Sequence, residues 1–310
     1  MILANWYERD DRDMNRPGRR QIRVPRQAGF SLLELLIVVA ILTIVMTAVF
    51  NGINQVTQRS QAEQVKVDLT QEGREFVDEF ERDLHQAGYP NCRMVATGSA
   101  NCPADYTLTG TPVAKNSAVA AGLVYVSSTR VVFEGDVDGD GVVDTVWYQL
   151  VDSAGNYPPT GTCPCTIQRG QKQKVNSYYP LDTQQQPNFT QELQNVVNSG
   201  QPSGTSQYGG GLSISGSTAW GATNSAYYAA ISSFKDYPVF QAYDQNGLII
   251  SMPQDLSAGS TLLNCSATST NCVKSIRLTI NLLATTTNAD MKTKIRPVMT
   301  LVGDARLVNN

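Results

Sequence analysis

Four aspartates in the stretch GDVDGDGVVDTV have the spacing of ligands for a metal ion. Carboxylates at alternate positions supply the hard oxygen atoms that calcium prefers, and Gly141 permits the sharp turn between them. A backbone carbonyl after the glycine adds one more oxygen. The expected calcium ligands are Asp136, Asp138, Asp140, Val142 and Asp144.

The same stretch also permits an interpretation without metal. The bidentate glutamate expected twelve residues into a calcium loop is absent, and Trp147 stands in its place. The flanking residues read as strands, so a hairpin whose Asp-Gly turns accept positive φ is the alternative. Four acids with no base among nine residues exceed what a turn needs, which favours calcium.

Six cysteines make disulfides the second chemical expectation. An even number favours an oxidising compartment and pairing, with Cys92–Cys102 and Cys265–Cys272 as the neighbours in sequence. A bridge between Cys163 and Cys165 would close a very small ring, and six cysteines allow 15 connectivities. Zinc is disfavoured because the chain has one histidine, His85, and no C-x-x-C pair.

Other chemistry finds little support. The sequence contains no G-x-S-x-G, no H-E-x-x-H and no P-loop, and His85 alone cannot form a catalytic triad. We therefore predict that the chain is not an enzyme. The net charge of −3 gives no argument for nucleic-acid binding.

An apolar run near the N-terminus is long enough to cross a membrane. Residues 30–50 would form a helix of about 31 Å, the thickness of one hydrocarbon core. Seven arginines precede the run, which predicts that residues 1–29 lie in the cytoplasm and the rest outside. Glu34 interrupts the run, and a carboxylate in hydrocarbon costs a few kcal/mol, so it is rarely incidental.

The stretch QAGFSLLELLIVVAIL resembles the class III signal of type IV prepilins and pseudopilins. The resemblance implies that prepilin peptidase cleaves after Gly29, that Phe30 becomes the N-methylated N-terminus, and that Glu34 serves subunit docking and assembly. A leader beginning at Met14 would contain five arginines and no acids, so we also expect translation to start there.

Beyond the membrane segment, apolar residues recur at helical spacing. The pattern predicts that an amphipathic helix continues over 51–88, with Gly73 at a close contact or a bend, and ends at Ala87-Gly88-Tyr89-Pro90. Charged residues near its end read as a solvated face; they are Glu75, Glu79, Arg82 and Asp83.

The segment 71–90 resembles the helix end of PilW-type minor pilins, which are related to the J-type minor pseudopilin of type II secretion. This resemblance implies an α+β fold, in which the long helix packs on an antiparallel sheet over residues 89–310. Residues 123–126, 130–133, 146–150 and 276–282 read as strands, and 298–310 resembles the last strand of the family. Residues 183–235 are rich in small polar residues and predict a polar insertion.

Three functions are compatible with these patterns. The first is a minor pilin that primes pilus assembly near the filament tip, with the major pilin and other minor pilins as partners. The second is a calcium-dependent tip adhesin, and the third a minor pseudopilin of a type II secretion system. All three imply residence in the bacterial inner membrane before assembly, and the pilus roles imply a later place at the cell surface.

Overall fold

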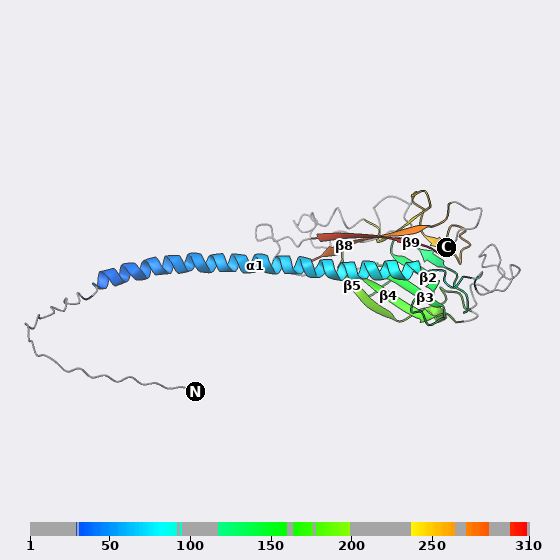
Figure 1. The fold of residues 1–310 in the computed structure, drawn as a ribbon, viewed down its shortest axis with the longest axis horizontal. Helices are drawn as coiled ribbons and strands as arrows, with labels where there is room; N and C mark the ends of the chain where they lie inside the picture. The colour runs from blue at the N-terminus through cyan, green and yellow to red at the C-terminus, as the bar shows by residue number, and fades with distance from the viewer. Residues whose placement is uncertain are drawn as a thin grey trace, which may run out of the picture. The chain divides into compact units, whose positions relative to one another are not determined.

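A computed structural model describes residues 29, 31–91, 94, 117–159, 164–175, 178–198, 237–263, 271–284 and 298–308. The chain divides into two compact units, Met1–Ile53 and Asn54–Asn310. The first contains the apolar beginning of helix α1, and the second contains the rest of α1 and a sheet (Figure 1).

Helix α1 spans Leu32–His85, 54 residues without a proline. It ends in a turn over 86–88, where Gly88 adopts a φ of +80° that suits a residue without a side chain. The backbone N–H of Gly88 donates to the carbonyl of Glu134 at 2.8 Å, and Asp136 donates to the carbonyl of Tyr89 at 2.8 Å. The chain leaving the helix is thereby attached to a strand of the sheet.

The described strands form one antiparallel sheet. Its order is β6-β8-β5-β4-β3-β2-β1-β7, and β9 pairs with β8. The strands are β1 (Leu123–Val126), β2 (Arg130–Gly135), β3 (Asp144–Val151), β4 (Cys165–Gln173), β5 (Phe189–Val196), β6 (Phe240–Tyr243), β7 (Gln254–Asp255), β8 (Ser275–Leu283) and β9 (Val298–Arg306). Together with α1 they confirm the predicted α+β class, a long N-terminal helix with an antiparallel sheet.

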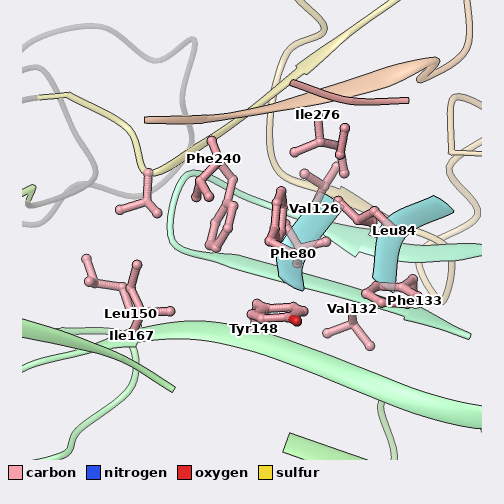
Figure 2. Close-up of a cluster of buried hydrophobic side chains, with 14 of the residues drawn as sticks. Phe80, Leu84, Val126, Val132, Phe133, Tyr148, Leu150, Ile167, Phe240 and Ile276 are labelled. Atoms are coloured by element: carbon pink, nitrogen blue, oxygen red, sulfur yellow. The ribbon is translucent and has the colours of Figure 1, made fainter. Parts of the chain in front are cut away.

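The core of the second unit lies between the end of α1 and one face of the sheet. Phe80 and Leu84 point from the helix into a cluster of buried side chains that includes Tyr148 and Phe240 (Figure 2). The Phe80 ring meets the Tyr148 ring edge-on, with centroids 5.2 Å apart, and stacks on Phe240 at 5.5 Å. Burying each large apolar side chain contributes about 1.5–3 kcal/mol, so these contacts fix the helix on the sheet.

Glycines allow the helix and the sheet to approach closely. A Cβ on Gly73 would lie 2.0 Å from Cδ1 of Leu301, and a Cβ on Gly303 would lie 2.5 Å from Cγ1 of Val77. Gly73 of α1 therefore lies at a close contact with β9. A close contact was one of the two roles predicted for this glycine, the other being a bend. A Cβ on Gly135 would lie 2.4 Å from the carbonyl oxygen of Gln86, where the helix ends.

The predicted start of the polar insertion at residue 183 is wrong. Residues 183–185 form a short 3-10 helix, and β5 follows as a strand paired with β4. Leu193 and Val196 are fully buried, and their burial favours a strand although its exposed positions are polar. Most of the remaining predicted insertion, residues 199–235, lies outside the described residues.

Candidate functional site

The first candidate site is the beginning of α1. Glu34 lies in the first helical turn, where the positive end of the helix dipole favours a carboxylate. Gly29 and Ser31 are exposed beside it, whereas Phe30 lies outside the described residues. The predicted cleavage and methylation at this junction stay predictions.

The apolar side chains on both sides of Glu34 are exposed along the whole segment from Leu32 to Phe50. Thr43 and Thr47 satisfy their hydroxyl groups within the helix, by donating to the carbonyls of Val39 and Thr43. Among the described residues, α1 is the one helix long and apolar enough to cross a membrane. A surface of this kind needs lipid or other apolar helices around it.

The second candidate site is the acidic loop between β2 and β3. One carboxylate oxygen from each of Asp136, Asp138 and Asp140 lies within 4.8 Å of the other two. Carboxylates also hold the turn: Asp136 accepts from the N–H groups of Gly139 and Gly141, at 2.9 and 3.1 Å. Both glycines have positive φ, at +76° and +85°. The loop therefore brings three of the predicted calcium ligands together. Their carboxylates also accept hydrogen bonds from backbone N–H groups of the loop and so hold its shape.

Asp144, at the first position of β3, accepts a hydrogen bond from Nε2 of Gln171 at 2.9 Å. Burial, and then the charges of Asp138, Asp140 and Asp136, together raise the pKa of Asp144 to about 6, although the hydrogen bond from Gln171 acts to lower it. The acidic loop is thus an electrostatically strained group of carboxylates that a cation would relieve.

A third cluster, which the sequence did not predict, joins α1 to the sheet. Asp83 has only 1% of its surface exposed and accepts from the Tyr148 hydroxyl at 2.7 Å and from Arg169 at 2.8 and 2.9 Å. Arg169 also lies 3.4 Å from Glu79. The solvated-face interpretation is therefore wrong for Asp83. A tyrosine and an arginine from strands distant in sequence satisfy this carboxylate, and no helical pattern signals them.

Two of the six cysteines lie in the described residues. Cys165 at the start of β4 and Cys272 before β8 are both buried, and both are disulfide-bonded. The remaining candidates lie outside the described residues; they are Cys92, Cys102, Cys163 and Cys265. The pairing predicted from spacing therefore stays a prediction.

The comparisons with known proteins concern the first site. Residues 24–50 match the family model described as the Prokaryotic N-terminal methylation motif. No curated protein and no solved structure matches the chain. The matched segment contains Gly29, Phe30 and Glu34, which are the residues of the predicted processing signal.

This motif defines a class: proteins with a type IV prepilin-like leader. Together with the long helix and the antiparallel sheet, it supports a type IV pilin- or pseudopilin-like protein. Such a leader implies processing by prepilin peptidase and assembly with other pilins. The leader and the apolar helix also fit anchoring in the inner membrane before assembly, and a structural protein fits them better than an enzyme.

Proposed function

We propose that the chain is a minor type IV pilin of the PilW type, which primes pilus assembly and lies at or near the filament tip. The observation that carries the proposal is the processing motif placed directly before an exposed apolar helix with Glu34 in its first turn. Removal of a 29-residue leader leaves 281 residues, which is bulky for a subunit repeated along a filament.

Glu34 is the residue we assign to assembly. Cleavage after Gly29 leaves a cationic amine on Phe30, one helical turn from the Glu34 carboxylate. A charge buried among apolar helices is tolerated when it is paired, so the amine of the same subunit or of a neighbour neutralises the carboxylate. Docking two subunits in register would then bring opposite charges together.

The test is replacement of Glu34 by alanine. We expect Glu34→Ala to be cleaved at the normal rate and to remain in the inner membrane, but to be at least about tenfold depleted from sheared pili. Glu63→Ala is a matched control because Glu63 lies on the same helix and is exposed. Normal incorporation of the Glu34 variant would contradict the role assigned to this carboxylate.

A second experiment distinguishes the pilus from the alternative assembly. Mass spectrometry of sheared pili should find a peptide that begins with N-methylated Phe30, at far lower abundance than the major pilin. Deletion of the gene should abolish pili and leave protein secretion intact. Loss of exoprotein release with normal pili would instead identify a minor pseudopilin of a type II secretion system.

We also propose that the acidic loop binds calcium and thereby stabilises the hairpin of β2 and β3. The close approach of Asp136, Asp138 and Asp140 and the raised pKa of Asp144 support this assignment. The expected ligands remain the four aspartates and the carbonyl of Val142. Calorimetry of the full-length protein in detergent should show a higher melting temperature with calcium than with a chelator, and an equal temperature would refute the proposal.

A calcium-dependent tip adhesin is the remaining alternative. In this alternative the polar insertion and the acidic loop form the adhesive surface; residues 199–235 of the insertion lie outside the described residues. Deletion of residues 200–230 separates the two roles. Normal piliation with lost adhesion would favour the adhesin, and lost piliation would favour a role of the insertion in assembly.

A further inference from the structure

The face of the sheet turned away from α1 carries a cation that has no acidic partner among the described residues. Tyr148 points toward the helix, because its hydroxyl donates to Asp83. Side chains alternate along a strand, so Trp147 and Gln149 point to the opposite face. Arg130 on β2 is paired in register with Gln149 and lies on that opposite face.

In the part of the chain that the structure describes, the Arg130 guanidinium is surrounded by aromatic rings and by no carboxylate. Its central carbon lies 3.2 Å from the ring centroid of Tyr157 and 4.8 Å from that of Trp147. In the described part of the chain no acid forms an ion pair with Arg130, and burial lowers its pKa. Removing a cation from water costs free energy, and a half-buried cation is therefore usually paired with an anion. An unpaired one suggests that a negative charge from a bound molecule neutralises it.

The hydrogen-bond donors around this cation are incompletely used. Nη2 of Arg130 donates to Oε1 of Gln149 at 2.8 Å, but its Nε–H is buried and has no protein partner in the described residues. The indole N–H of Trp147, whose residue is only 4% exposed, likewise has no partner. Since both rings lie against the flat guanidinium, its N–H edges are the groups that can hold an anion.

A row of glutamines extends from Arg130 across the neighbouring strands. Gln149 pairs in register with Gln168 on β4, and Gln168 pairs with Gln191 on β5. Nε2 of Gln149 donates to Oε1 of Gln168 at 3.2 Å. Among the described residues no acceptor lies within hydrogen-bond distance of the amide nitrogen of Gln168, and Gln191 is exposed. The row therefore becomes more open with distance from the cation.

We propose that this row, Arg130, Gln149, Gln168 and Gln191 with the rings of Tyr157 and Trp147, binds an acidic saccharide. The guanidinium would take the carboxylate of one sugar, held in place by the buried Gln149. The outer amides of Gln168 and Gln191, which both donate and accept, would match the hydroxyl groups of the next sugars. Adjacent strands lie about 4.8 Å apart, close to the length of one sugar ring in a chain. A bound peptide would more commonly pair with a strand edge than cross the strands.

The site does not rest on the pilus assignment, because its residues all belong to the sheet of the second unit. The test uses the full-length protein in neutral detergent and isothermal titration with three probes: a trimer of galacturonic acid, its methyl ester and a trimer of glutamate. We expect the acid trimer to bind, and the ester and the peptide to bind about tenfold more weakly or not at all. Absence of binding by the acid trimer, or equal binding by either comparison probe, would overturn the proposal.

A variant of Arg130 and a matched control test whether the guanidinium binds the acid. Arg130→Gln should weaken binding of the acid trimer about tenfold or more, because a charge-assisted hydrogen bond is lost. Arg277→Gln is the matched control, since Arg277 also lies over a tyrosine but has an acidic partner in Asp304 at 2.8 Å. Equal loss in both variants would indicate nonspecific attraction of charge and sink the proposal.

Gln191→Ala tests the row separately from folding, because the Gln191 side chain is exposed. It should weaken binding of the trimer about two- to fivefold and leave binding of the monomeric acid unchanged. If Arg130→Gln lowers the melting temperature, this variant decides the question alone. Unchanged trimer binding by Gln191→Ala would overturn the extended site.

Discussion

Replacement of Asp83 by asparagine should strongly destabilise the second unit. Asp83 is 1% exposed and is the common acceptor for Tyr148 and Arg169, so it joins the end of α1 to β3 and β4. The variant keeps the size of the side chain and removes its charge. The positive charge of Arg169 then remains near the core beside a neutral asparagine that cannot neutralise it.

The magnitude follows from the burial of the pair. Removing one partner of a buried ion pair costs roughly 3–5 kcal/mol. Arg169 retains Glu79 at 3.4 Å and 15% of its side-chain surface, which reduces the loss. We therefore expect Asp83→Asn to lower the free energy of unfolding by about 2–4 kcal/mol. Tyr148→Phe removes the hydrogen bond donated to Asp83 and the one accepted from Nε of Arg169, and should cost about 1–3 kcal/mol.

The assay is denaturant unfolding of the full-length protein in detergent, followed by tryptophan fluorescence. Asp78→Asn is the control, since Asp78 lies on the same helix and is exposed, and it should change the free energy by less than about 0.5 kcal/mol. In combination with Arg169→Gln, Asp83→Asn should cost about 1–3 kcal/mol less than the two single changes added together. Equal small effects of Asp83→Asn and Asp78→Asn would refute the reasoning.

Two further predictions concern the hairpin of β2 and β3. Gly135→Ala should lower the free energy of unfolding by about 1–3 kcal/mol in the same denaturation assay, because its Cβ would lie 2.4 Å from the backbone oxygen of Gln86; an unchanged midpoint would show that the helix end is not held there. The pKa of Asp144 is raised to about 6, so without calcium the folded chain binds a proton on this carboxyl group more tightly than the unfolded chain does. The stability that protonated Asp144 contributes is therefore lost as the pH rises from about 4 to 6. Calcium needs the ionised form, and melting curves should show a larger stabilisation by calcium at pH 7 than at pH 5; a larger effect at pH 5 would contradict the assignment.

Local patterns were sufficient for the apolar N-terminal helix and for several strands. The apolar run, its arginines and Glu34 form a contiguous signal, and the motif match over 24–50 covers the same residues. Alternation of apolar residues predicted the strands now found as β1, β2, β3 and β8. β5 was missed because four of its eight residues are glutamine, asparagine or glutamate, and burial of Leu193 and Val196 outweighs that composition.

The sequence by itself predicted the processing signal and determined the apolar helix, because both depend on residues close together along the chain. It also determined the acidic loop, whose aspartates are neighbours in sequence. Only the tertiary structure decided the role of Asp83, which depends on Tyr148 and Arg169 at separations of 65 and 86 residues. The row from Arg130 to Gln191 is likewise a product of strand register, which places side chains together across strands that no local pattern connects.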